Sequence, residues 1–281
     1  MREDTPPSKF LTSMPKAPAE RVLRRRDHLL FLLLIPFLLV SIFLLPRGVK
    51  ERYFVLRRGS LSGVLLSSYV HLETGHLENN LWHYLLVMLP ILWLESDRRR
   101  FRRMMLLLFL LLPPLLSLSS LVAYGGDSWG FSGVVAGLIG YLPYCVYSHL
   151  RARGVGLNLN FLFAIFLANA ALLFLLRDAL LVGGTILLLS LSSLYPTRRG
   201  MREMVELLRS QLGRPRSIRA LPLFVWRGTL ILLSVCFLFY LPCLLPEEFV
   251  VGGEMIDVMG HFIGYVFGLF SPAILEARTA R

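Results

Sequence analysis

Apolar runs long enough to cross a membrane recur along the whole chain. A transmembrane helix needs about 20 predominantly apolar residues. Eight segments approach that length: 29–45, 77–95, 104–124, 132–148, 158–176, 179–195, 223–245 and 256–274. Hydrophobic residues make up 55% of the chain, more than a soluble domain can bury. The sequence therefore predicts an all-α, polytopic membrane helix bundle at 29–274, between a basic segment 1–28 and a tail 275–281.

Basic residues are unevenly divided between the two sides that these spans define. The formal net charge is +12, but the basic residues lie between apolar runs, which favours membrane-surface loops over a nucleic-acid interface. With the N-terminus inside, most of the 30 Lys and Arg residues fall on the cytoplasmic side. We therefore expect a multi-pass protein of the cell membrane with cytoplasmic N- and C-termini, in contact with membrane lipids and without a nucleic-acid partner. The exception is the basic loop 46–76, whose structure the pattern does not predict.

Two connections between the later spans have recognisable patterns. Arg177 and Asp178 separate the runs 158–176 and 179–195, and because charges are costly in mid-bilayer, they predict a tight turn at an interface. Segment 198–212 repeats apolar residues at helical spacing, which is typical of an amphipathic helix on the membrane surface or of an ordinary connecting helix.

Polar residues gather at the start of the second span. His76 and Asn80 are four residues apart, so both project from one face of the predicted helix, and His71 precedes them. Polar side chains are expensive inside a membrane and mark functional sites. The alternative is a set of interhelical hydrogen bonds that holds the bundle together.

A second cluster, Gly130 to Gly133, lies where a loop enters the fourth span. Ser132 would occupy the N-terminus of a helix, where free N–H groups favour a developing negative charge. A serine at this position is also a common helix cap.

The third cluster is His261 near the start of the last span. Gly260, Gly264 and Gly268 recur every four residues and give the helix one flat stripe, which allows close packing against the Ser132 helix. A single histidine in a span is more often structural than catalytic. In the eight-span topology, however, His76, Ser132 and His261 all fall at one depth, a little below the outer surface.

This ordered set of motifs resembles the rhomboid family of intramembrane serine proteases. The matching motifs are HxxxxHxxxN at His71, His76 and Asn80, GxSG at Ser132, and GHxxGxxxG at His261. The resemblance covers roughly residues 60–149 and 223–274. It implies a six-helix core, here with two additional helices at about 158–195.

The resemblance also implies a reaction and a role for each residue. Ser132 would attack a peptide carbonyl in a substrate's transmembrane segment, and His261 would be its base, without an orienting carboxylate. His76 and Asn80, beside Gly130, match positions that stabilise the oxyanion, and His71 matches a structural position. Neither a metal nor an organic cofactor is expected, and the expected partners are transmembrane protein substrates.

Two departures leave alternatives open. Many family members carry an aromatic residue at the position of Ala136, which packs on the catalytic histidine, and Tyr265 or Tyr141 would have to replace it. Loop 46–76 also lacks the Trp that many members have there. The first alternative is a catalytically inactive relative that binds membrane clients. The second is a transporter or channel, although the sequence shows no inverted repeat.

Overall fold

The structure is a computed structural model of the 281-residue chain. It describes residue 23 and residues 25–125, 129–211, 221–245, 250–251, 254–255 and 257–279. Most of the predicted basic segment 1–28 and most of the loop 246–255 lie outside the described residues.

Long helices occupy all eight predicted spans, which confirms an all-α, polytopic bundle. The first span is one continuous run of α1 (Arg25–Leu29), η3 (Leu30–Leu34) and α2 (Ile35–Phe43), and the third is a run of α6 (Arg98–Leu106), η5 (Leu107–Leu111) and α7 (Leu112–Tyr124). The other spans are the single helices α5 (Thr74–Leu94), α8 (Ser132–Ala152), α9 (Asn160–Leu175), α10 (Leu180–Leu194), α12 (Leu221–Leu238) and α14 (Val258–Thr279). α14 continues beyond the predicted end at 274, so most of the predicted tail 275–281 is helical.

Six helices in the described part of the chain are long and apolar enough to cross a membrane. The two predicted spans outside this set are α5, whose first turns contain the polar cluster, and α9, which has 16 residues. At 1.5 Å per residue, α9 is about 24 Å long, shorter than the roughly 30 Å hydrocarbon core. The chain is therefore a multi-pass membrane protein by the length and composition of its helices.

Shorter elements connect these spans. Loop 46–76 folds into α3 (Arg47–Tyr53), α4 (Leu61–Leu66) and η4 (Ser67–Tyr69). The others are η6 (Tyr195–Thr197), α11 (Arg198–Gln211), α13 (Leu241–Leu244) and the antiparallel pair β1 (Val250–Val251) and β2 (Glu254–Met255). The predicted turn between α9 and α10 is present, and Asp178 adopts a left-handed φ of 58° in it. The helix predicted at 198–212 is α11, and its apolar face packs against the core.

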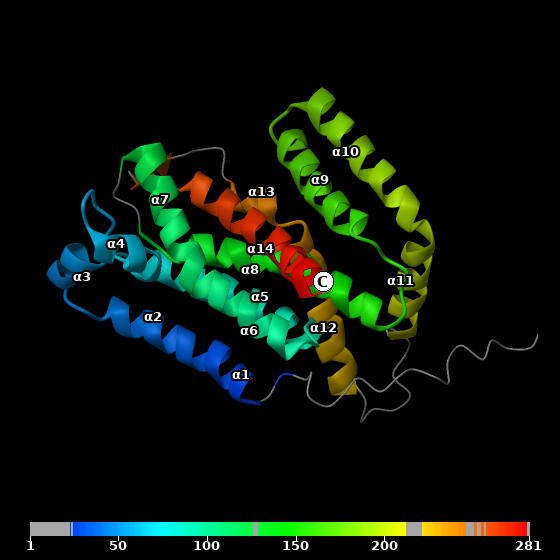
Figure 1. Ribbon diagram of the computed structural model, residues 1–281, viewed down its shortest axis with the longest axis horizontal. Helices are drawn as coiled ribbons and strands as arrows, with labels where there is room; N and C mark the ends of the chain where they lie inside the picture. Colours follow the sequence, from blue (N-terminus) through cyan, green and yellow to red (C-terminus); the bar gives the residue numbers. More distant parts are fainter. Residues whose placement is uncertain are drawn as a thin grey trace, which may run out of the picture.

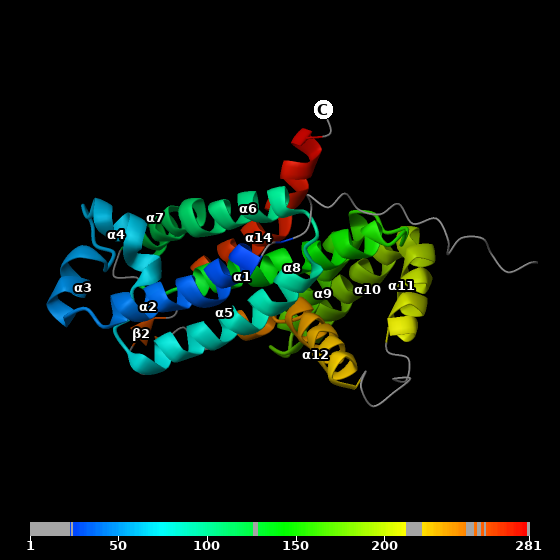
Figure 2. The ribbon, with the colours of Figure 1, turned by 90° about the horizontal axis from the view of Figure 1, so that it is seen from below.

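α8 is the central helix of the bundle. Of its membrane-spanning window, 83% is buried, the highest share of the six candidate spans. α5 and α14 pack against it, while α9 and α10 form a separate antiparallel pair to one side (Figure 1). In both views, α3 and α4 lie at one end of the long axis and α11 lies at the other (Figure 2). The polar clusters of α8 and α14 therefore belong to the end that carries α3 and α4.

Three basic residues of loop 46–76 have partners within the protein. Lys50 is buried and donates to the carbonyl oxygens of Phe43 at 2.9 Å and His71 at 3.2 Å. Arg47 pairs with Glu51, and Arg58 donates to the carbonyl of Gly125. Of the three, only Lys50 is buried and stabilises the loop fold from inside, whereas Arg47 stays exposed at the surface.

A buried ion pair lies at the other end of α5. Both oxygens of Glu95 accept hydrogen bonds from Arg100, at 2.6 and 3.0 Å, and the Tyr141 hydroxyl donates to the same carboxylate at 2.5 Å. The Glu95 side chain is 0% exposed. This network ties α5 to α6 and α8.

We expect Glu95→Gln to destabilise the protein by about 3–5 kcal/mol, because it leaves the Arg100 charge buried without its counter-ion. Glu51→Gln is the matched control, since it breaks an exposed pair with Arg47 and should change the unfolding free energy little. Denaturant titration of both variants in detergent measures the difference. Equal effects of the two substitutions would contradict this account of the ion pair.

Candidate active site

Close packing of α8 and α14 brings the second and third polar clusters together. A Cβ atom added to Gly264 would lie 2.2 Å from the carbonyl oxygen of Gly133, and one added to Gly268 would lie 1.9 Å from that of Gly137. Real Cβ atoms do not approach backbone this closely, so only glycine permits the contact. The predicted glycine stripe of α14 does face the Ser132 helix.

Ser132 and His261 line the same small cavity. Ser132 is the first residue of α8, and Gly130 and Asp257 also line the cavity. Its volume of about 20 Å³ has room for roughly one water molecule. Within the described part of the chain, no hydrogen bond joins the Ser132 and His261 side chains. Such bonds are often long in unliganded sites and shorten in the substrate complex.

The backbone carbonyl of Leu244 fixes the orientation of His261. Nδ1 of His261 lies 2.6 Å from that oxygen, so Nδ1 carries the proton and donates it. Nε2 is then the unprotonated nitrogen that can accept a proton. In serine hydrolase triads a carboxylate has this orienting role.

Asp257 has a different role from that of a third catalytic residue. Its Oδ1 accepts a hydrogen bond from the Gly260 N–H at 2.7 Å, which caps the first turn of α14, and its Oδ2 accepts one from the Ser120 hydroxyl. Asp257 therefore anchors the start of the His261 helix to α7.

The backbone before Ser132 has a conformation that favours glycine. Gly130 has a φ of 117°, and its N–H donates to the carbonyl of Ser67 at 3.0 Å. The His76 ring lies against Gly130, because an added Cβ would be 2.7 Å from His76 Cε1. In the part of the chain that the structure describes, the N–H groups of Ser132 and Gly133 have no acceptor. Free N–H groups at a helix N-terminus are suited to stabilising an oxyanion.

His71 and Asn80 reach this backbone through hydrogen bonds and do not line the cavity. Asn80 Nδ2 lies 2.9 Å from His71 Nε2, and the Phe131 N–H donates to the same nitrogen at 3.3 Å. The His71 ring also meets the His76 ring edge-on, with centroids 5.1 Å apart. His71 thus holds the residue before Ser132, and Asn80 holds His71.

Neither aromatic replacement considered for Ala136 forms a ring contact with His261 among the described residues. Tyr141 binds Glu95, and the Tyr265 hydroxyl is buried without a partner among the described residues. No aromatic ring of the described chain packs against the His261 ring. The Leu244 carbonyl is the contact that the structure shows in its place.

Several contributors to the cavity have weak sequence signals. Ser67, Ser117 and Trp129 line it, and the Ser67 and Ser117 hydroxyls are 3.0 Å apart. Asp257 has a recognisable signal, since an aspartate directly before an apolar helix is a typical N-cap. Leu244 has none, because it acts through its backbone.

We expect the stability of the protein to decrease below about pH 6.5 because of His71. Burial, followed by the nearby His76 and Lys50, lowers the pKa of His71 to about 3. In the unfolded chain the pKa of this histidine is about 6.5. Between pH 3 and pH 6.5, therefore, His71 binds a proton in the unfolded chain but not in the folded protein. The unfolding free energy then falls by about 1.4 kcal/mol per pH unit as the pH decreases. Denaturant titrations from pH 7 to 5 should show a flatter slope for His71→Gln. An unchanged slope would contradict the assignment.

Comparison with known proteins identifies no relative. No family model matches the sequence, and no curated protein or solved structure matches it either.

Proposed function

We propose that the protein is a rhomboid-like intramembrane serine endopeptidase with a Ser132–His261 dyad. The observation that supports this most is the shared cavity, in which Ser132 begins α8 and His261 presents Nε2 after donating Nδ1–H to Leu244. A nucleophile, a base with a fixed tautomer and free N–H donors at one point are the parts that acyl transfer needs.

The proposed reaction follows from these parts. The Ser132 hydroxyl oxygen attacks the scissile carbonyl carbon while its proton passes to His261 Nε2. The oxyanion is stabilised by the N–H groups at the start of α8, with His76 beside them. His261 then gives the proton to the leaving amine as the C–N bond breaks. A water molecule, deprotonated by His261, hydrolyses the acyl-enzyme and restores Ser132.

The environment of the site suggests the class of substrate. The cavity lies at one end of a bundle of membrane-spanning helices, so peptide bonds near the end of another protein's transmembrane segment are the proposed target. With both termini cytoplasmic in the cell membrane, as the charge bias favours, this end faces outward. The roles of Asn80 and His71 in the proposal are to position His76 and Phe131, in agreement with their bonds.

The test is cleavage of labelled single-span substrates by the purified protein in lipid vesicles. We expect cleavage by the wild type and a loss of at least about 10³-fold in both Ser132→Ala and His261→Ala. Ser192→Ala on α10 and His83→Ala, whose ring bonds Tyr240, are matched controls that should keep activity. Cleavage that survives Ser132→Ala contradicts the proposal. Binding of the substrates without cleavage by the wild type would favour the client-binding alternative.

A further inference from the structure

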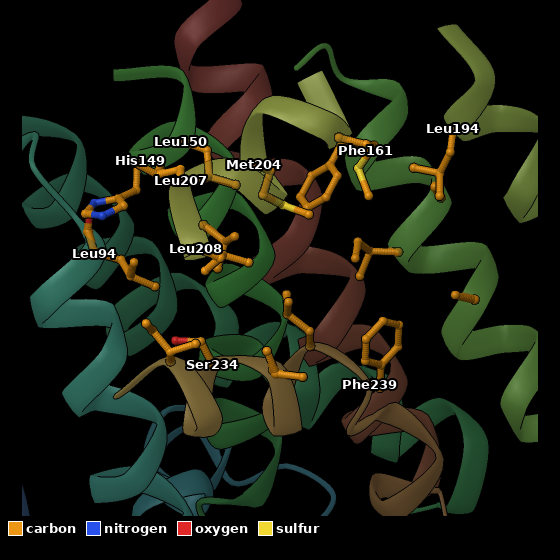
Figure 3. A pocket seen from close by; sticks show the side chains of 18 of the residues that line it. Leu94, His149, Leu150, Phe161, Leu194, Met204, Leu207, Leu208, Ser234 and Phe239 are labelled. Carbon is orange, nitrogen blue, oxygen red and sulfur yellow. The ribbon is translucent and has the colours of Figure 1, made fainter. Parts of the chain in front are cut away.

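A large apolar cavity lies at the opposite end of α8 from Ser132. Its volume is about 460 Å³, within the range of small-molecule sites. Figure 3 shows side chains from α8, α9, α11 and α12 directed into this space, among them Leu150, Phe161, Met204 and Ser234, together with Phe239 just after α12. The cavity lies between α8, α9, α10, α11 and α12, each of which contributes lining residues.

One arginine belongs to this lining, and a second lies within electrostatic range of it. Arg153, just after the end of α8, lines the cavity, and Arg227 on α12 is near enough to interact with it electrostatically. His149 donates Nδ1–H to the Leu94 carbonyl at 2.9 Å, so its Nε2 is left to accept a hydrogen bond from Arg153. Neither arginine forms a salt bridge with a carboxylate in the described chain.

Arg153 is partly buried whereas Arg227 is exposed, so the need for a counter-charge falls on Arg153. Burial and the Arg227 charge lower the pKa of Arg153, which means that both reduce the stability of its charged form. Cations in or beside a membrane span normally have a counter-charge. Glu95, the carboxylate that lines the adjoining cavity, is already bound to Arg100.

Space for a polar headgroup adjoins the apolar cavity. A second, more open cavity of about 790 Å³ shares lining residues with the first: Trp93, Leu94, His149 and Arg153. Arg153 therefore stands at the junction of the apolar space and a more open space. A lipid fits these two spaces, because its acyl chain needs an apolar space and its charged headgroup needs an open one.

We propose that the apolar cavity of about 460 Å³ binds one anionic glycerophospholipid from the surrounding bilayer. An acyl chain occupies the space between α9, α10 and α12, and the phosphate lies against Arg153 and Arg227. The lipid fills the space between α10 and the helices α8 and α12. The additional helices thereby acquire a role that is independent of the proteolytic site.

The test is native mass spectrometry of the protein in mild detergent, titrated with phosphatidylglycerol and with phosphatidylcholine. We expect one phosphatidylglycerol per chain, bound about 30-fold more tightly than phosphatidylcholine, since two arginines contribute to recognition of the anionic headgroup. The double variant Arg153→Ala/Arg227→Ala should lose this preference. Arg52→Ala/Arg57→Ala removes the same charge at the other end of the molecule and should keep it.

A second variant separates the cavity from the charges. Ala168 lines the cavity, so Ala168→Phe fills part of it and leaves both arginines in place. It should reduce retention of both lipids at least 10-fold while the protein keeps its melting temperature within a few degrees. Equal retention of the two lipids by the wild type would indicate only loosely associated bilayer lipid and would overturn the proposal. A preference that survives the Arg153/Arg227 substitutions, or retention unchanged in Ala168→Phe, would overturn it as well.

Discussion

Gly268→Ala is expected to destabilise the protein by about 3 kcal/mol and to reduce proteolysis at least about 100-fold. The new Cβ would lie 1.9 Å from the carbonyl oxygen of Gly137, and two backbones cannot relieve that overlap by changing a rotamer. α14 must therefore move away from α8. A displacement of about 1 Å between Ser132 and His261 is enough for a 100-fold loss. Thermal unfolding and substrate cleavage measure the two effects.

Gly184→Ala on α10 is the matched control for this substitution. It makes the same chemical change in another apolar helix, but an added Cβ meets no atom within 4 Å. We expect it to keep wild-type stability and cleavage. If Gly268→Ala were equally harmless, the close contact between α8 and α14 would not exist in the protein.

Gly130→Ala is expected to reduce cleavage about 100-fold with a smaller loss of stability. Its φ of 117° is unfavourable for alanine, and the added Cβ would meet His76 Cε1 at 2.7 Å. The backbone that leads into Ser132 would shift, and the N–H donors at the start of α8 would shift with it. Steady-state kinetics should place the loss in kcat, because the substrate-binding surface is otherwise unchanged.

Gly59→Ala distinguishes contact from backbone strain. Gly59 also has a positive φ, at 81°, but nothing lies within 4 Å of its Cβ position. It should show the stability cost of the conformation and retain full cleavage. A loss of activity equal to that of Gly130→Ala would mean that strain, and not the His76 contact, explains the effect.

The spans were predictable because hydropathy alone determines them. Each of the eight apolar runs coincides with a helix, and Arg177 and Asp178 form the expected turn. The fold of loop 46–76 was not predictable, because it depends on long-range bonds such as that of Lys50 with His71. A basic residue in a loop gives no sign that it will be buried.

The sequence predicted those parts of the site that depend on side-chain patterns, and not those that depend on backbone contacts. Glycine spacing predicted the contact between α8 and α14, and motif order predicted that Ser132 and His261 converge. The Leu244 carbonyl was not foreseen, since any residue offers the same backbone acceptor. Asn80 was expected beside the oxyanion, and the structure places it on His71. The lipid cavity depends on how α9 to α12 pack, which no local pattern encodes.

The central claim is that His261 activates Ser132, and covalent labelling tests it without a known substrate. A fluorophosphonate reacts with serines that a neighbouring base activates, because the oxygen displaces fluoride as the base removes the proton. After incubation of the folded protein, peptide mass spectrometry identifies the modified residue. We expect one adduct, on Ser132, that disappears in His261→Ala and remains in His83→Ala. No adduct on Ser132, or an adduct that forms equally fast without His261, would contradict it.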